Sequence, residues 1–294
     1  MSLEQKYTPP LPTLSMFSIA EFYIKHNSER VNAIFNQLDE EKKDIRTYAQ
    51  LESVQDMVMF MACIANGANI NKIDEITGDT VLHVICQYKY KHIDIFEIIK
   101  YCIENGGNMN IQDNFGNTPF HYFVCKKVFN PSYNGTLLNN CMYYDQQMTK
   151  LIEYIIIHGG GNMEIKNNDG RTVFLYMCAQ CYIDVDVIKL CIENKYCNIN
   201  TCDRLNSTVL HTLISNLDKP WTINNNEANV LSITKCLIEN GYSCMNSIDV
   251  YNKNILQYLY EKNRLNKNLI SYCINCTCLV MSNTNIYSRF IRCI

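Results

Sequence analysis

Cysteine and histidine are the residue types in this chain that could do chemistry, because both bind metals and both take part in catalysis. The 294 residues include 16 cysteines and 6 histidines. Two groups of cysteines are closely spaced: the pair Cys178 and Cys181, and a C-terminal cluster of Cys273, Cys276, Cys278 and Cys293. Structural zinc takes four such ligands. A zinc site in the C-terminal cluster therefore stays an alternative, although the second Cys-x-x-Cys pair that such sites usually have is missing.

The histidines show no catalytic arrangement. No Walker loop, GxGxxG, GxSxG or HExxH motif is present in the chain. A Cys-His pair is possible in any chain with these counts, and nothing in the spacing singles one out. We therefore expect a protein that is not an enzyme, with no catalytic residue, no cofactor and no metal.

Three of the histidines close a four-residue motif that recurs along the chain. Thr80-Val81-Leu82-His83, Thr118-Pro119-Phe120-His121 and Thr208-Val209-Leu210-His211 have the same form. Thr172-Val173-Phe174-Leu175 keeps the pattern without its histidine, and Asn254-Ile255-Leu256-Gln257 keeps only the apolar centre. The starts are separated by about 36 to 54 residues, which is typical of stacked copies of one supersecondary unit.

Each copy of the motif indicates the same local plan. The threonine opens a helix, because its hydroxyl can accept from the free amides of the first turn. A second helix follows, as over Asp94 to Glu104, where apolar residues recur at helical spacing. Asn-Gly then ends this helix, since both residues tolerate a positive φ. The sequence therefore predicts an all-α fold of repeated helix-turn-helix units.

These residues resemble the ankyrin-repeat family, over roughly positions 50 to 262. The resemblance implies an ankyrin-repeat solenoid of about five helix-turn-helix repeats with insertions and helical caps. It also implies a structural role for the turn residues Thr80, His83, Thr118, His121, Thr208 and His211. The chain contains 37 Asn and 35 Ile but only 8 Ala, which we interpret as coding pressure from an AT-rich genome. In this style the chain is most similar to the degenerate ankyrin-repeat proteins of poxviruses, and the alternatives are other AT-rich sources such as giant viruses and some protists.

The predicted organisation has four parts. Residues 1–14 are expected to be a flexible lead, 15–49 a helical N-terminal cap, 50–262 the repeats and 263–294 a C-terminal cap or tail. Glu40 to Asp44 is charged, and we interpret it as a solvated helix end. The cysteines at equivalent repeat positions are expected to be reduced packing residues.

The net charge and hydropathy pattern exclude several partner classes. The net charge is -3 and no basic stripe is present, which argues against nucleic-acid binding. No run of eighteen apolar residues exists, so no membrane span is expected. The predicted localisation is cytoplasmic, in the host cytoplasm if the source is viral, with the nucleus as the other possibility.

The resemblance implies that the chain binds another protein, with the partner on the concave side against the turn tips. The candidate partner-binding residues lie on these tips and in two insertions: Asp113, Asn114, Phe115, Tyr133, Asn168, Asp169, Arg171, Arg204 and Trp221. For the aspartates the alternative is that they only make the turn, and for Trp221 that it covers its own helix pair.

For a poxvirus protein, the implied role is host range or immune evasion, with a host signalling or restriction factor as partner. One alternative is a substrate adaptor for a cullin ubiquitin ligase, although the tail lacks the expected Leu-Pro opening. Another is a truncated remnant of a longer ankyrin protein.

Overall fold

The computed structural model describes residues 16–36, 44–49, 51, 53–87, 95–124, 149–179, 185–217, 227–261 and 267–280. The expected lead at 1–14 lies outside this part of the chain. So do the candidate residues Tyr133 and Trp221, the cysteines Cys181 and Cys293, and the side chain of Cys278. The chain divides into two compact units, residues 1–108 and 109–294, which are described separately.

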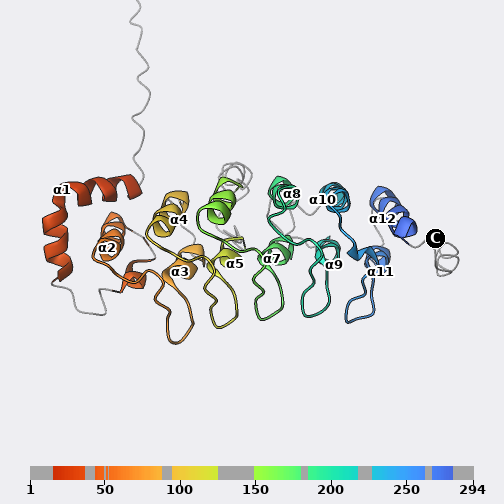
Figure 1. The fold of residues 1–294 in the computed structure, drawn as a ribbon, viewed down its shortest axis with the longest axis horizontal. Helices are drawn as coiled ribbons and strands as arrows, with labels where there is room; N and C mark the ends of the chain where they lie inside the picture. The colour runs from red at the N-terminus through yellow and green to blue at the C-terminus, as the bar shows by residue number, and fades with distance from the viewer. Residues whose placement is uncertain are drawn as a thin grey trace, which may run out of the picture. The chain divides into compact units, whose positions relative to one another are not determined.

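Unit 1 contains α1 (Met16–Asn36), the 3-10 helix η1 (Ile45–Tyr48), α2 (Val54–Ala65), α3 (Val81–Gln87) and α4 (Ile95–Glu104). Helix α1 is kinked at Asn27, whose φ of -134° is not helical. It packs on α2, while α3 packs on α4 and on η1 (Figure 1). In the described part of this unit, α3 and α4 form a paired first and second helix.

Unit 2 alternates short first helices with second helices. In chain order these are α5 (Pro119–Val124), a helix at 149–157, α7 (Val173–Ala179), α8 (Val185–Glu193), α9 (Val209–Ser215), α10 (Glu227–Glu239), η2 (Cys244–Asn246), α11 (Ile255–Glu261) and α12 (Lys267–Val280). The first helices pack in the row α5, α7, α9 and α11, and α8, α10 and α12 form a second row (Figure 1). Over the described residues the fold is all-α, and the β-bridges are isolated ones, at Lys166 with Thr172 and Cys202 with Thr208. This is the architecture of an ankyrin-repeat solenoid.

Helix ends follow from local side-chain chemistry. At the start of α2, Ser53 and Asp56 form a capping box, in which each side chain accepts from the backbone N–H of the other residue. At the ends of the second helices, asparagine side chains donate to the carbonyl oxygen four residues earlier. These are Asn66, Asn105, Asn194 and Asn240. Each of these carbonyls also accepts from the backbone N–H of the same asparagine, so the side chain adds a second hydrogen bond at the helix end.

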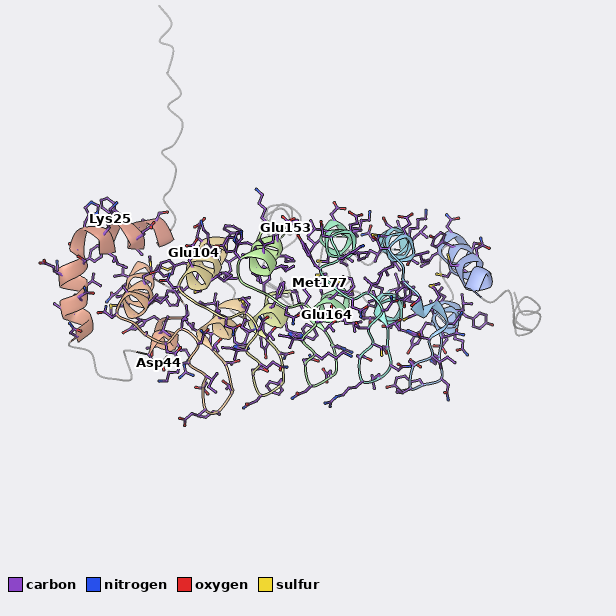
Figure 2. The ribbon with its side chains drawn as sticks, in the orientation of Figure 1. Lys25, Asp44, Glu104, Glu153, Glu164 and Met177 are labelled. Atoms are coloured by element: carbon purple, nitrogen blue, oxygen red, sulfur yellow. The ribbon has the colours of Figure 1, made fainter. Side chains whose placement is uncertain are left out.

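The core lies between the two rows of helices within each unit. Its largest fully buried side chains include Phe60 in unit 1 and Phe120, Phe123 and Phe174 in unit 2. Met177, on α7, is also fully buried (Figure 2). Burial of such side chains contributes about 2 kcal/mol each, so the paired rows supply most of the stability of the repeats.

The expectation that Asp44 is solvated is wrong. Its carboxylate accepts from the backbone N–H of Arg46 at 3.0 Å and caps η1 (Figure 2). It also pairs with the Arg46 guanidinium and with Lys72 Nζ, and only 14% of its side chain is exposed. The rest of the charged segment, 40–43, lies outside the described residues. None of the described helices has the length and apolar character needed to cross a membrane.

Candidate protein-binding surface

Five hairpin loops lead into the first helices, and we call them finger loops (Figure 1). They span 74–79 in unit 1 and 113–117, 167–171, 203–207 and 249–253 in unit 2. In every finger loop the backbone N–H of the first residue donates to the carbonyl oxygen of the last residue, at 2.8 to 3.1 Å. Each loop is therefore closed by a hydrogen bond within its own backbone.

An anchor side chain at the first position holds each finger loop from inside. The anchors are Asp74, Asp113, Asn167, Asp203 and Asp249. In each of them Oδ1 accepts from two backbone N–H groups of its own loop, as Asp113 does from Phe115 and Asn117 at 2.8 Å. Asn167 is the equivalent of Asp113, whereas Asp169, for which turn formation was the alternative to partner binding, is exposed at the third position of its loop.

The second carboxylate oxygen of the anchor takes one of two partners. Tyr122 and Tyr258 stand nine residues after their anchors, and their hydroxyls donate to Asp113 and Asp249 Oδ2 at 2.6 Å. At the equivalent position the other aspartate-anchored repeats carry Val84 and Thr212.

An arginine takes the place of the missing tyrosine in both of these repeats. Arg46 Nη1 donates to Asp74 Oδ2 at 2.9 Å, and Arg171 Nε donates to Asp203 Oδ2 at 3.3 Å. Each arginine precedes its aspartate by roughly one repeat length in the sequence. Every anchor carboxylate is thus paired, by a phenol from its own repeat or by a guanidinium from the element before it.

The turn histidines join the start of a first helix to the next finger loop. The backbone N–H of Thr118 donates to His121 Nδ1 at 3.1 Å, so the ring proton is assigned to Nε2. His121 Nε2 then donates to the Arg171 carbonyl at 3.2 Å, and His211 repeats this pattern with Thr208 and Lys253.

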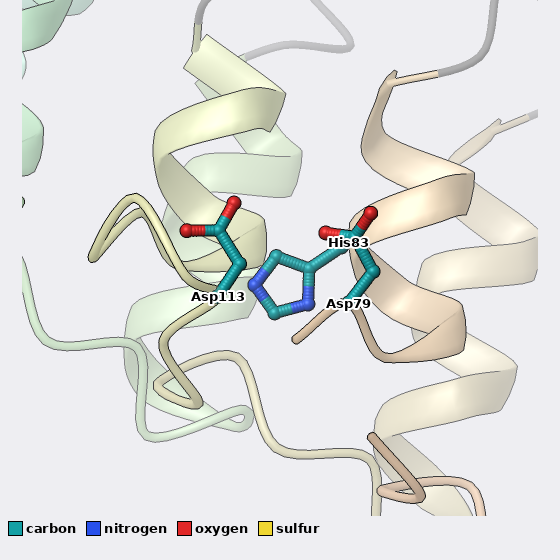
Figure 3. Close-up of side chains that lie close together, drawn as sticks. All are labelled: Asp79, His83 and Asp113. Atoms are coloured by element: carbon teal, nitrogen blue, oxygen red, sulfur yellow. The ribbon is translucent and has the colours of Figure 1, made fainter. Parts of the chain in front are cut away.

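In unit 1 the His83 ring lies at the start of α3 and accepts from the Thr80 N–H at 2.9 Å (Figure 3). All three rings are buried. Both ring nitrogens of His121 and His211 therefore form hydrogen bonds within the fold.

Neighbouring finger loops of unit 2 are connected by a backbone ladder. The N–H groups of Asn168, Arg204 and Val250 donate to the carbonyls of Phe115, Asp169 and Leu205, at 2.9 to 3.0 Å. Each rung joins the second residue of one loop to the third residue of the loop before it. The tips are consequently held at a fixed spacing, which suits a recognition surface.

A second set of bridges runs behind the finger loops. Asn110 donates to the Gly160 carbonyl and accepts from the Asn162 N–H, both at 2.8 Å. Asn71 forms the same pair of bonds within unit 1, and Asn200 forms it with Gly241 and Ser243. Glu164 stands in this position in its repeat and accepts from the Asn198 N–H (Figure 2).

The contact residues predicted from the sequence fall into an exposed group and a buried or half-buried group. Asn114, Phe115, Asn168, Asp169 and Arg204 are exposed on the finger loops. Asp113 is buried in its own turn, and Arg171 is half-buried against Asp203. The geometry around Asp113 therefore matches the alternative in which this aspartate makes the turn.

The sequence analysis missed an apolar patch on and beside the last two finger loops. Leu205, Ile248, Val250 and Tyr251 are 41 to 63% exposed. Leu205 and Val250 are joined by a ladder rung, and the Ile248 carbonyl accepts from Asn206 Nδ2, so the four residues adjoin one another. The signal in the sequence was the set of apolar residues around a single aspartate in Ile248-Asp249-Val250-Tyr251. We call these four residues the tip patch.

The repeat cysteines are packing residues. Cys63, Cys102 and Cys191 lie in second helices, Cys86 and Cys178 lie in first helices, and all five are buried free thiols. Burial raises the pKa of Cys63 and Cys191 to about 12, so these thiols stay protonated at neutral pH. Near the C-terminal end, burial also raises the pKa of Cys273 to about 12.

Stability is expected to fall as the pH drops from 7.5 to 5.5. Burial lowers the pKa of His211 below its ordinary value, although the Lys253 carbonyl and the charge of Asp249 favour its cation. A depressed folded-state pKa means that the unfolded chain binds more protons. The stabilisation is therefore complete above the unfolded pKa of about 6.5 and is lost below it.

The variant His211→Gln should show a shallower dependence, because Gln257 holds the same position in the last repeat without a titrating group. Urea denaturation followed by circular dichroism at several pH values and constant ionic strength measures both slopes. Equal slopes in the two proteins would contradict the assignment to His211.

Comparisons with known proteins also indicate ankyrin repeats. The protein family described as "Ankyrin repeat" matches residues 77–114. The chain is 26% identical to ankyrin repeat protein L92 of Acanthamoeba polyphaga mimivirus over 211 residues, which is 69% of this chain and 40% of the relative. It is 22% identical to ankyrin repeat protein OPG189 of variola virus over 196 residues, or 60% of this chain and 34% of the relative.

The chain thus spans well under half the length of these viral relatives. Among solved structures, an ankyrin repeat domain from Acinetobacter baumannii AYE aligns with a TM-score of 0.56 at 18% identity, covering 78% of this chain and 95% of that domain. This likeness concerns the fold alone. Together with the recurring Thr-x-x-His turns and finger loops, these matches identify ankyrin repeats in the chain, which is similar to ankyrin repeat proteins of a poxvirus and a mimivirus.

Proposed function

We propose that this chain binds a host protein on behalf of a virus, and that the tip patch is the centre of its binding surface. Ankyrin repeats are protein-interaction modules, and the viral relatives support a host-directed role. A role in host range or immune evasion is the form of this function that we propose, without enzymatic chemistry at the surface.

The observation that carries the proposal is the exposure of large apolar side chains on a rigid support. Tyr251 is 63% exposed and Val250 is 54% exposed, while the anchor Asp249 between Ile248 and Val250 is buried. Because the backbone ladder fixes the loops, their main chain loses little conformational freedom when a partner covers these side chains. Exposed aromatic residues in such a position are typical binding hot spots.

Charged side chains lie beside the patch. Arg204 and Asp169 are exposed, and a ladder rung joins the Arg204 N–H to the Asp169 carbonyl. In the described part of the chain the Arg204 guanidinium makes no ion pair. We place these two residues at the polar rim, where they select the partner and contribute less to affinity.

The double variant Leu205→Ser/Tyr251→Ser is expected to weaken partner binding by at least about 30-fold, the effect of losing one hot spot. Both side chains are exposed, so the melting temperature should stay close to that of the parent. The measurement is affinity purification from host cells with mass spectrometry, followed by titration of the purified partner.

Ile157→Ser is the matched control, because Ile157 is also 63% exposed but lies on the helix at 149–157 and not on a finger loop. It should retain the partner. If the parent chain captures no reproducible partner, the proposed binding function is contradicted. A partner retained at full affinity by the double variant would place the surface elsewhere.

A further inference from the structure

The third residues of the four finger loops in unit 2 are equivalent, and we call them the tip row: Phe115, Asp169, Leu205 and Tyr251. In each of these loops the next residue has a positive φ, between +56° and +75°, so the loops share one backbone conformation. The three apolar members are 67, 41 and 63% exposed, and Asp169 is exposed as well. The row therefore presents an apolar, an acidic and two further apolar side chains in succession.

The finger loops offer a partner side chains but no free main-chain donors. In the loops at 167–171, 203–207 and 249–253, every backbone N–H donates to an acceptor within the protein. Two side-chain amides are also engaged, since Asn168 Nδ2 donates to the Asn114 carbonyl and Asn206 Nδ2 to the carbonyl of residue 248. A carbonyl group of a partner that faces these loops thus finds no backbone N–H to accept from.

A segment that covers the tip row must consequently satisfy its own backbone. A polyproline II segment has no internal hydrogen bonds, and a β-strand forms its bonds to neighbouring strands. The carbonyls that either of them turned toward the loops would lose water without gaining a donor, which is costly. An α-helix pairs its N–H and C=O groups internally except at its ends. The saturated finger loops therefore favour a helix.

The interval between the loops also suits a helix. The first helices α5, α7, α9 and α11 pack side by side (Figure 1), and packed helices lie about 8 to 10 Å apart. The loops that lead into them repeat at the same interval. Seven residues of an α-helix rise about 10.5 Å and fall only ~20° short of two turns, so side chains seven apart can meet successive loops.

The two extended conformations match this interval differently. A β-strand covers it in about three residues, and side chains three apart lie on opposite faces of the strand. A polyproline II segment repeats its face every three residues, or about 9.3 Å. Its spacing is therefore acceptable, and its unpaired backbone is what disfavours it. This conformation is the rival that an experiment must exclude.

The carboxylate of Asp169 adds a charge to the match. In the described part of the chain it forms no ion pair. The loops on either side carry Phe115 and Leu205, so a wholly apolar helix face would cover the carboxylate without giving it a partner. A lysine or arginine at that step of the helix pairs with the carboxylate, while its aliphatic stem stays on the apolar face.

We propose, resting on the protein-binding function above, that the tip row takes an amphipathic α-helix of the host protein. Apolar side chains of this helix lie on Phe115, Leu205 and Tyr251, and a lysine or arginine lies on Asp169. The four side chains follow one another at steps of about seven residues. Their drift of ~20° per step keeps them within one helix face.

The test uses the purified full chain and synthetic peptides, so it does not depend on finding the host partner. The probe is an alanine- and glutamine-based helix of about 26 residues with four positions spaced by seven. Leucine occupies the first, second and fourth positions and lysine the third. A second peptide has the reversed sequence, because a helix can run either way along the row.

Amide chemical shifts of the ¹⁵N-labelled chain are followed at up to about 1 mM peptide. Shifts of the four loops in unit 2 are expected with at least one of the two helical peptides. A proline-rich peptide that carries the same leucines and lysine at three-residue spacing is the polyproline II probe. It should leave these amides unmoved.

Two variants locate the helical peptide, and both change exposed side chains. Leu205→Ser/Tyr251→Ser should weaken it by at least about 10-fold, whereas Ile157→Ser should bind it like the parent. Asp169→Lys should weaken it by about fivefold, the upper range for one exposed ion pair. A peptide with glutamate in place of its lysine should recover this loss. Melting temperatures check that each variant is folded.

Several outcomes would overturn the proposal. These are absence of shifts from both helical peptides, equal shifts from the proline-rich peptide, or unchanged binding in the double variant. Failure of the glutamate peptide to recover the loss would overturn the pairing at Asp169. A captured host partner that depends on the tip patch but binds through an extended segment would overturn the helix and leave the function standing. Helical peptide binding without any captured partner would contradict the function alone.

Discussion

Replacing Gly116 with alanine is expected to lower the free energy of unfolding by about 2 to 4 kcal/mol. Gly116 has a φ of +73°, a conformation that alanine adopts only with strain. An added Cβ would also lie 2.8 Å from the backbone nitrogen of Asn168 and 2.7 Å from its Oδ1. The substitution therefore pushes against the rung that joins Asn168 to Phe115. Urea denaturation followed by circular dichroism measures the loss.

Gly160→Ala is the control that separates strain from contact. Gly160 also has a positive φ, of +59°, but a Cβ there would meet no atom within 4 Å. Its cost should be only the conformational term of about 1 kcal/mol. A comparison of Gly116→Asn with Gly160→Asn sharpens this, because asparagine tolerates positive φ at 206 and 252 in the equivalent position. Equal losses at 116 and 160 would mean that close packing of the finger loops contributes nothing.

Replacing His121 with alanine is expected to cost about 3 kcal/mol, for two reasons. The ring is fully buried, so its removal leaves a cavity. The backbone N–H of Thr118 also loses its acceptor, and the Arg171 carbonyl keeps only the hydrogen bond from the Asn167 N–H. Chemical denaturation measures the loss, and hydrogen exchange of the finger loop at 167–171 should show increased opening.

His121→Leu should cost less, because Leu175 occupies the same position in the third repeat and is buried. Leucine fills the space of the ring, so the remaining cost is the lost hydrogen bond of the Thr118 N–H. His158→Ala is the external control, since His158 is exposed at a helix end and should change stability by less than about 0.5 kcal/mol. Should His121→Ala prove as mild as His158→Ala, the turn histidine would have no structural role.

The fold was predictable because the motif that defines it is local. Thr-x-x-His places its donor and acceptor three residues apart, so the spacing itself encodes the bond between Thr118 and His121. The apolar spacing of the second helices is equally local. The recurrence of the motif then predicted that the units stack, since a unit that cannot bury its own apolar face must pack on a copy of itself.

The pairing of the anchor aspartates was only partly visible in the sequence. Asp113 with Tyr122 and Asp249 with Tyr258 share a spacing of nine residues, but two occurrences do not form a clear pattern. Arg46 with Asp74 and Arg171 with Asp203 are separated by 28 and 32 residues. Such contacts depend on how neighbouring elements stack, which a single sequence does not specify.

The surplus of asparagine has a structural use that composition alone did not indicate. Asn66, Asn105, Asn194 and Asn240 cap second helices, and Asn71, Asn110 and Asn200 bridge successive units of structure. Coding pressure and structure are therefore compatible explanations. An amide offers both a donor and an acceptor, which a carboxylate or hydroxyl does not provide in the same geometry.

The ladder of finger loops has a consequence for how such proteins change length by gene duplication. Each rung uses only main-chain groups, so a copied repeat inserted between two finger loops would find the same donor on one side and the same acceptor on the other. Apolar side chains at the tips, such as those of Phe115, Leu205 and Tyr251, take no part in the rung and can diverge after the copy is made. A new recognition surface can thus arise from drift at exposed positions such as 115, 205 and 251, while the scaffold beneath inherits its bonds unchanged.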